Sequence, residues 1–399
     1  MELIGDVKTY EWGKLGLDSE VAKLAQLNSV KFTAVEGTPY SEFWMGDHPS
    51  GPSLLKDTSQ ELGAFIAENA DSANGSMKSL PFLFKVLSIR KALSVQVHPN
   101  KEEAERLHAE HPDIYKDANH KPELAIALTT FRALCGFRPL AEIQGLCKKF
   151  EPLMQLIGPE IIENLESNTP ESLKLCYSKL MTSAQDDITK CIETIRDDAK
   201  HQEELEACGL KDIFATLYKD FPNDVGILSI FFLNVINLKP GQAIFLAAKE
   251  PHAYLEGDCL ECMACSDNVI RAGLTPKFKD IHTLIETLNY NGEPAEKKLF
   301  QSAKIDDLEL FVPPVKDFSV GKIHIPITNT FYQMRHSKYA SILLVLDGEA
   351  IIKTSTYGEI SVRRGSVIFI PGDSGCYLEF YRKSEADNFT AYMAMYNFF

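Results

Sequence analysis

Residues 238–246 read LKPGQAIFL and residues 362–370 read VRRGSVIFI, so a glycine turn precedes an apolar strand in both segments. With one gap allowed, the match extends further along the chain, where His252 falls on Gly375. An internal repeat of this kind predicts two related β-barrels, of which the second has lost the histidine and holds no metal. Any glycine turn before an apolar strand would look similar, so a chance match is the alternative reading.

Short strands divided by turns lie on both sides of this repeat. Segments 80–87 and 92–97 are apolar runs bounded by Gly or Pro, and closely spaced strands follow from about residue 310, a pattern typical of a jelly roll or sandwich. Between these β segments, residues 139–224 carry apolar side chains at spacings of three and four, which predicts helices. Strand signals return at Ile227, and a short helix is predicted over 280–288.

The predicted fold is therefore mainly β with an α-helical insertion. We expect residues 1–138 to form the first part of a catalytic barrel and residues 139–224 to form the helical insertion. Residues 225–305 complete that barrel, and residues 306–399 form a C-terminal jelly roll without metal. None of the candidate site residues below falls in the insertion, so the insertion is expected to supply no pocket residue.

The charge balance limits the class of partner. The chain of 399 residues has 41 Lys and Arg against 56 Asp and Glu, a formal net charge of -15. Such a surface repels nucleic acid and anionic membranes, so an anionic substrate would need a local cluster of basic side chains. No signal peptide or membrane-spanning run is recognisable, and nine cysteines without a secretory signal are expected to be reduced thiols. We expect a cytoplasmic protein and a monomer.

Strict alternation in SVQVHP, residues 94–99, places Ser94, Gln96 and His98 on one face of a strand. A hydrogen-bonded core histidine would explain this pair alone. Glu123 and His252 add a carboxylate and a second imidazole, and such a mixed nitrogen and oxygen set suits a divalent ion such as zinc. One zinc ion per chain is predicted.

The cysteines at 259, 262 and 265 begin like an iron–sulfur motif. A fourth cysteine should follow four residues after Cys265, where Val269 stands. We therefore interpret these cysteines as buried structural thiols.

Four longer segments resemble one known family. They are YSEFWMGDHPSGPS at 40–53, FKVLSIRKALSVQVHPN at 84–100, NHKPE at 119–123 and PHAYLEGDCLECMACSDNVIRAGLTPK at 251–277. Together they closely resemble type I mannose-6-phosphate isomerases of eukaryotic kind. The resemblance implies two cupin-type jelly-roll barrels with an inserted helical domain, and zinc bound by Gln96, His98, Glu123 and His252. It also implies a catalytic Arg271 and a pocket formed by Trp12, Lys85, Ser94, Lys121, Tyr254, Glu261, Asp267 and Lys277.

The implied reaction interconverts D-mannose 6-phosphate and D-fructose 6-phosphate by proton transfer through an enediolate. Its products would feed GDP-mannose synthesis and protein glycosylation, or mannose catabolism. Glu261 and Lys121 are both candidates for carrying the proton. Two other classes stay open at this point: an iron-dependent oxygenase, which a two-histidine, one-carboxylate site would also serve, and a non-catalytic sugar-phosphate sensor.

Overall fold

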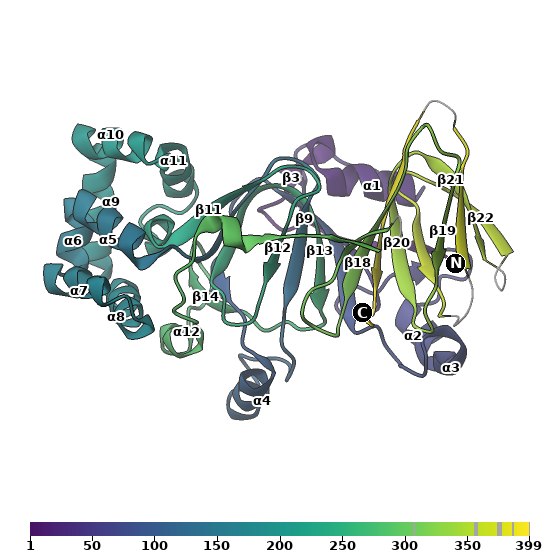
Figure 1. The fold of residues 1–399 in the computed structure, drawn as a ribbon, viewed down its shortest axis with the longest axis horizontal. Coiled ribbons are helices and arrows are strands. Elements are labelled where there is room, and N and C mark those ends of the chain that lie inside the picture. Colours follow the sequence, from purple (N-terminus) through teal and green to yellow (C-terminus); the bar gives the residue numbers. More distant parts are fainter. Residues whose placement is uncertain (306–307, 355–357, 373–376, 385–386, 399) are drawn as a thin grey trace.

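The computed structural model describes residues 1–305, 308–354, 358–372, 377–384 and 387–398. The molecule is long, with helices at one end, a large sheet in the middle and two further sheets at the other end (Figure 1). The predicted combination of β-structure with a helical insertion is confirmed, and the sheets are antiparallel. Gly375, the residue matched to His252 by the repeat, lies outside the described residues.

The middle sheet is antiparallel and has eleven strands. Its main path is β15 (Leu299–Phe300), β12 (Ala243–Leu246), β9 (Glu123–Ala127), β13 (His252–Ala264), β7 (Phe82–Ile89), β5 (Glu42–Met45) and β2 (Asp6–Lys8). Off this path lie β10 (Phe131–Phe137), β11 (Leu233–Leu238), β8 (Val95–Val97) and β14 (Ile270–Gly273). The long strand β13 pairs with β7, β8, β9 and β10, so it connects most of the sheet.

The C-terminal part contains an eight-stranded and a four-stranded sheet. The larger consists of β16 (Ala303–Ile305), β17 (Leu308–Phe311), β18 (Ser319–Ile325), β25 (Phe389–Met395), β20 (Ser341–Asp347), β23 (Val367–Ile370), β1 (Glu2–Ile4) and β6 (Leu54–Leu55). The smaller consists of β19 (Phe331–Arg335), β24 (Tyr377–Arg382), β21 (Glu349–Thr354) and β22 (Gly358–Arg363). The first strand of the chain thus pairs with β23, far away in sequence.

The two matched segments, residues 238–246 and 362–370, have the same local structure. Gly241 and Gly365 have φ angles of 86° and 84°, in the left-handed region that glycine enters without a steric penalty. Each of these glycines is followed by a short strand, β12 in one segment and β23 in the other. Aromatic and aliphatic side chains from the middle and C-terminal sheets, such as Phe84, Leu260, Ile342 and Phe369, share one core between the two sheets.

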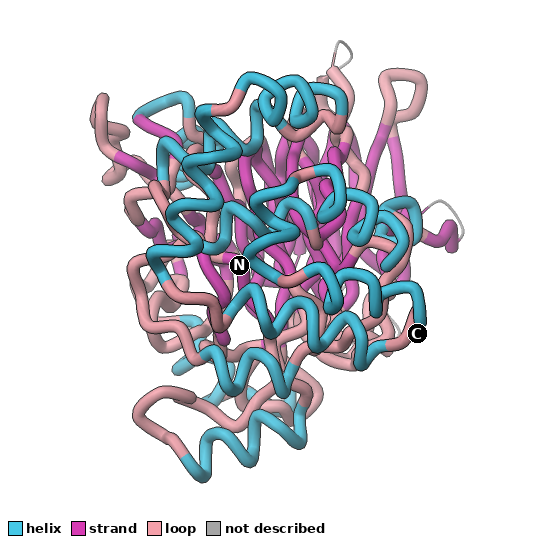
Figure 2. Tube along the Cα trace, turned by 90° about the vertical axis from the view of Figure 1, so that its left-hand side faces the viewer, coloured by secondary structure: helices cyan, strands magenta, loops and turns pink. Residues whose placement is uncertain are grey.

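Seven helices form the insertion: α5 (Leu140–Lys149), α6 (Glu151–Ile157), α7 (Pro159–Glu163), α8 (Pro170–Met181), α9 (Gln185–Asp197), α10 (Ala199–Ala207) and α11 (Lys211–Asp220). They cover one end of the sheets (Figure 2). The periodic residues behave as the spacing predicts, since Leu153, Ile157 and Leu165 are buried. Helix α8 begins where the Thr169 hydroxyl accepts the Ser172 N–H and Pro170 stands in the first turn.

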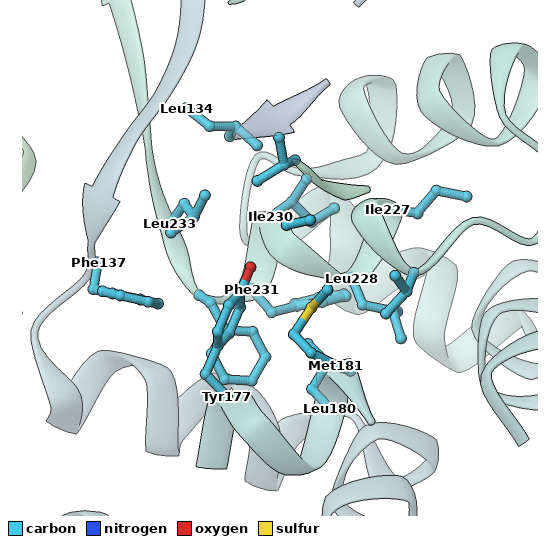
Figure 3. Packing of buried hydrophobic residues seen from close by; sticks show 14 of the residues in the cluster. Leu134, Phe137, Tyr177, Leu180, Met181, Ile227, Leu228, Ile230, Phe231 and Leu233 are labelled. Atoms are coloured by element: carbon cyan, nitrogen blue, oxygen red, sulfur yellow. The ribbon is translucent and has the colours of Figure 1, made fainter. Parts of the chain in front are cut away.

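Residues 225–231 differ from the prediction. The strand expected from Ile227 starts only at Leu233, and Val225–Phe231 forms the 3₁₀ helix η3. The Asp224 carboxylate caps η3 by accepting the Gly226 N–H, and every residue of η3 is buried. A continuous apolar run has no period that separates a buried strand from a buried helix, so the sequence pattern was ambiguous here. Figure 3 shows Ile227, Leu228, Ile230 and Phe231 packed among residues of α8, β10 and β11.

The remaining helices lie around the sheets. They are η1 (Gly16–Asp18), α1 (Glu20–Asn28), α2 (Leu62–Glu68), α3 (Ala70–Ala73), α4 (Lys101–Glu110), α12 (Ile281–Thr287) and η4 (Ala295–Lys298). The short 3₁₀ helix η2 (Asn164–Ser167) lies within the insertion, between α7 and α8. The helix predicted over 280–288 is confirmed as α12, with Asp280 capping it by accepting the Thr283 N–H. Within the described residues, no helix has the length and apolarity needed to cross a membrane.

Candidate active site

Two histidines and a glutamate meet at the ends of three strands of the middle sheet. Glu123 is the first residue of β9, His252 is the first residue of β13, and His98 directly follows β8. All three side chains are buried, and one ligand atom from each lies within 4.8 Å of the others. It is the only such group of three or more His, Cys, Asp or Glu side chains found over the described parts of the chain.

The orientation of both imidazoles is fixed by contacts between Nδ1 and a backbone carbonyl oxygen. His98 Nδ1 lies 2.8 Å from the carbonyl oxygen of Asn268, and His252 Nδ1 lies 2.9 Å from that of Glu250. An imidazole that donates Nδ1–H to a carbonyl presents its other nitrogen as a free lone pair, which is the usual arrangement of a metal-binding histidine.

The free nitrogens point at one carboxylate. His98 Nε2 lies 3.4 Å from one oxygen of Glu123, and His252 Nε2 lies 3.4 Å from the other. His98 Nε2 and Glu123 Oε2 are buried without a hydrogen-bond partner. Buried polar atoms without partners are costly, and a divalent cation bound between them would remove that cost. The residues present therefore fit a metal ion.

The charge states of these groups agree with that use. Burial lowers the pKa of His98 to about 4, so the imidazole stays neutral. Burial alone would raise the pKa of Glu123, but the positive charges of His98, when it is protonated, and of Lys121 hold the pKa of this carboxyl well below its usual value. Neutral imidazole and ionised carboxylate are the forms that bind metals.

Gln96 stands directly beside the cluster. Its Cα is the register partner of His252 across β8 and β13, and its side-chain nitrogen lies 3.4 Å from His252 Nε2. Oxygen and nitrogen of a side-chain amide exchange places when the amide flips, so the Gln96 oxygen can face the same point. Gln96 is thus within reach as a fourth ligand.

A buried ion pair lies next to the cluster on β7 and β13. Lys85 and Glu261 are register partners, and Lys85 Nζ lies 3.0 Å from Glu261 Oε2. Glu42 on β5 approaches the same ammonium group at 3.7 Å. Burial alone would lower the pKa of Lys85, but the carboxylates of Glu261 and Glu42 outweigh burial and raise it. Burial raises the pKa of Glu261, although the Lys85 charge opposes this.

A cavity of about 580 Å³ opens onto these groups. Its lining contains all the predicted site residues except the two histidines: Trp12, Lys85, Ser94, Gln96, Lys121, Glu123, Tyr254, Glu261, Asp267, Arg271 and Lys277. His98 and His252 lie behind this lining and reach it through Glu123 and Gln96. The structure therefore brings the predicted residues together in one place.

The five Lys and Arg side chains that line this cavity fall into two kinds, those with a carboxylate partner and those without one. Lys91 Nζ lies 3.5 Å from Glu11 Oε1. Lys85 is paired with Glu261, and Lys121 Nζ lies 3.6 Å from Glu123 Oε1. Arg271, whose Cα is the register partner of Gln96, and Lys277 have no ion-pair partner within the ranges the structure describes. Two positive charges in the cavity are thus free to bind an anion.

Sequence reasoning missed several residues that line this cavity: Glu42, Trp44, His48 and Phe221. Glu42 and Trp44 alternate on β5, and this period of two could have indicated a shared face. Phe221 follows α11, so the expectation that the insertion supplies no pocket residue is wrong. Phe221 reaches the cavity because the chain turns back there toward the sheet, and Lys91 Nζ lies 4.8 Å from the centre of its ring.

Cys259, Cys262 and Cys265 do not form a metal-binding cluster within the described residues. Cys259 and Cys262 are buried and lie in two different apolar cores, because residues three apart on a strand face opposite sides. Cys265 is partly buried. For Cys259 and Cys262, the interpretation as buried thiols is confirmed.

Comparison with known proteins gives consistent matches along the chain. Residues 1–140 match the catalytic domain of phosphomannose isomerase type I, and residues 149–233 match the helical insertion domain of the same family. The mannose-6-phosphate isomerase of Macaca fascicularis is 43% identical over 398 residues, which cover 94% of this chain and 93% of that protein. The mannose-6-phosphate isomerase of Rattus norvegicus is 44% identical over 388 residues, or 91% of each chain.

Solved structures agree with the sequence matches. A crystal structure of a phosphomannose isomerase mutant from Salmonella typhimurium has a TM-score of 0.85 and 28% identity, and the match covers 99% of both chains. The fold, the site and these matches together define the protein as an enzyme of the isomerase class. The chain belongs to the type I phosphomannose isomerase family. This membership removes the oxygenase and the non-catalytic sensor from consideration.

Proposed function

We propose that this enzyme interconverts D-mannose 6-phosphate and D-fructose 6-phosphate by proton transfer through an enediolate, with one zinc ion per chain. The buried His98–Glu123–His252 cluster at one cavity with two unpaired cations carries the proposal. The relatives from Macaca fascicularis and Rattus norvegicus are named mannose-6-phosphate isomerases, which supports this substrate.

The metal ligands in this proposal are His98 and His252 through Nε2, the carboxylate of Glu123 and the amide oxygen of Gln96. A bound zinc ion supplies Lewis acidity, which stabilises negative charge on substrate oxygens. Two nitrogen and two oxygen ligands suit zinc among the common divalent ions. Solved structures from Salmonella typhimurium include variants in which a histidine, a glutamate, a lysine or an arginine is replaced, the residue types of this candidate site.

Proton transfer between C2 and C1 requires a group that can hold the proton near neutral pH. Glu261 is one candidate, because burial raises the pKa of its carboxyl. Lys121 is the other candidate, with Nζ 3.6 Å from Glu123 Oε1. Lys85 stays charged in either case and keeps the Glu261 carboxylate in place at 3.0 Å.

Substrate binding is assigned to the remaining residues of the cavity. Arg271 and Lys277 bind anionic oxygens of the substrate, and the Ser94 hydroxyl adds a hydrogen bond. Trp12 and Tyr254 supply aromatic walls, and Asp267 accepts sugar hydroxyl groups. The proposal also retains the four segments predicted from sequence, the cupin assignment, a monomeric state, a cytoplasmic location and a role in GDP-mannose synthesis or mannose catabolism.

The test is a coupled assay that detects fructose 6-phosphate formed from mannose 6-phosphate by the purified enzyme. Glucose 6-phosphate in place of mannose 6-phosphate is the specificity control. Turnover that requires mannose 6-phosphate and zinc supports the proposal. Absence of product at saturating substrate, in protein that holds one zinc per chain, would refute it.

A further inference from the structure

The end of the helical insertion reaches one of the substrate loops. Leu274, Thr275, Pro276 and Lys277 line the cavity directly after β14. Asp224, which lies at the end of the insertion in sequence, contacts this loop at two points. Asp224 Oδ1 accepts the Leu274 N–H at 2.7 Å, and Asp224 Oδ2 lies 3.6 Å from Lys279 Nζ.

The loop adopts a backbone conformation that needs such support. Leu274 has a φ of 53°, in the left-handed region that a branched residue enters at a cost. Its side chain is buried, so the strained residue is also fixed in a core. A strained residue keeps its conformation only when surrounding contacts stabilise it. At Leu274, the hydrogen bond from its N–H to Asp224 is the polar contact of this kind.

Asp224 itself is rigidly placed. It caps η3 by accepting the Gly226 N–H at 2.7 Å, and η3 is buried along its whole length. The side chains of η3 pack against Tyr177, Leu180 and Met181 of α8 (Figure 3). Because η3 is firmly packed, the Asp224 carboxylate has a defined position, and the loop that it binds is therefore held in a defined position relative to η3.

The backbones of η3 and the loop also touch directly. A Cβ placed on Gly226 would lie 2.5 Å from the Leu274 nitrogen, so only glycine allows this approach. Phe221, three residues before Asp224, lines the same cavity from the insertion side. Two residues near the end of the insertion thus contribute to one wall of the site.

We propose that Asp224 is a positioning residue for sugar-phosphate binding: it joins the helical insertion to the Leu274–Lys279 loop and sets the place of Lys277. This inference rests on the proposed function. The insertion then has a role in the active site. Its packed core holds the Asp224 carboxylate in place, and this carboxylate in turn positions the Leu274–Lys279 loop.

The kinetic test compares Asp224→Ala with Asp224→Asn in the zinc-loaded enzyme. Asp224→Ala removes the acceptor for both N–H groups, so we expect KM for mannose 6-phosphate to rise about tenfold or more, the usual effect of a lost charge-assisted contact. kcat should change by less than about threefold, because Lys277 binds ground state and transition state alike. Asp224→Asn keeps an amide oxygen at the same place, so KM should stay within about threefold of wild type.

Asp212→Ala is the matched control, because Asp212 is an exposed aspartate of α11 that contributes nothing to the cavity. Both kinetic constants should stay at wild-type values in this variant. A merely structural role of Asp224 would lower the folded fraction, and hence apparent kcat, with KM unchanged. That result in Asp224→Ala, or wild-type values for both constants, would overturn the inference.

A second measurement does not depend on a variant that folds. Amide hydrogen exchange of the wild-type enzyme should show slow exchange at Leu274, whose N–H is bonded to Asp224, and faster exchange at the exposed Phe278 of the same loop. Equal, fast exchange at Leu274 would also overturn the inference. A wild-type enzyme without turnover would instead refute the proposed function, so the two failures are distinguishable.

Discussion

Replacement of Arg271 by lysine tests how the cavity binds its substrate. Arg271 stands opposite Gln96 on the neighbouring strand and has no ion-pair partner within the described ranges, so its guanidinium is available to an anion. Burial lowers the pKa of Arg271, but an arginine remains charged at neutral pH. Arg271→Lys therefore keeps the charge and removes only the planar fork that holds two oxygens in a fixed direction.

The expected loss follows from the number of contacts removed. One charge-assisted hydrogen bond contributes ~1.5 to 3 kcal/mol, and each ~1.4 kcal/mol changes the rate tenfold, so kcat/KM should fall by roughly 10- to 150-fold. The zinc content and the unfolding temperature should not change, because Arg271 contacts neither His98 nor Glu123 by any bond found here. Arg132→Lys is the control, since Arg132 pairs with Glu256 on the surface of β10, away from the cavity.

The coupled assay for fructose 6-phosphate measures both constants. A fall in kcat with little change in KM means that Arg271 binds mainly in the transition state. A rise in KM alone means that Arg271 binds the phosphate in the ground state. Wild-type kcat and KM in Arg271→Lys would refute the placement of Arg271 in the site.

Three further predictions concern the metal ion and the proton carrier. Chelation should abolish turnover and added zinc should restore it, because the buried His98 and Glu123 atoms have no other partner; full activity in demonstrably metal-free protein would contradict this. Metal analysis of the zinc-loaded enzyme should give one ion per chain, and two tightly bound ions would show that a second site exists. Glu261→Gln should lower kcat by ~100-fold or more with zinc retained, as loss of a general base does, whereas Lys190→Gln on the exposed side of α9 should leave kcat unchanged. A Glu261→Gln rate near wild type would leave Lys121 as the proton carrier.

Local sequence patterns were sufficient to predict those strands and helices whose buried face follows from the spacing of residues within the same element. The alternation of Ser94, Gln96 and His98 predicted a strand with one polar face, and the spacing of Leu153 and Ile157 predicted a helix with one buried face. The predicted strand over 92–97 is only Val95–Val97, because strand ends depend on which neighbour continues the pairing.

Contacts between distant segments could not be predicted in this way. Phe221 reaches the cavity, and Asp224 reaches the loop at Leu274, only because η3 is buried between α8 and the sheet, and nothing in their spacing indicates this. Trp12 and Lys277 carry no periodic signal either; their assignment came from the resemblance to the isomerase family. The pairing of β1 with β23 joins residues more than 360 positions apart, and no local pattern encodes it.

The placement of charge in the cavity explains how an acidic protein can bind a sugar phosphate in one orientation. Lys85 and Lys121 are near the metal cluster, and carboxylates of Glu261 and Glu123 neutralise them at 3.0 and 3.6 Å. Arg271 and Lys277 are unpaired among the described residues, and Lys277 lies in an exposed loop at the mouth. A dianionic phosphate therefore gains most from Arg271 and Lys277, whose positive charge is not already compensated, and the exposed position of Lys277 directs the phosphate outward. We infer that the net charge of -15 and the phosphate site do not conflict, because carboxylates neutralise Lys85 and Lys121 and leave Arg271 and Lys277 free.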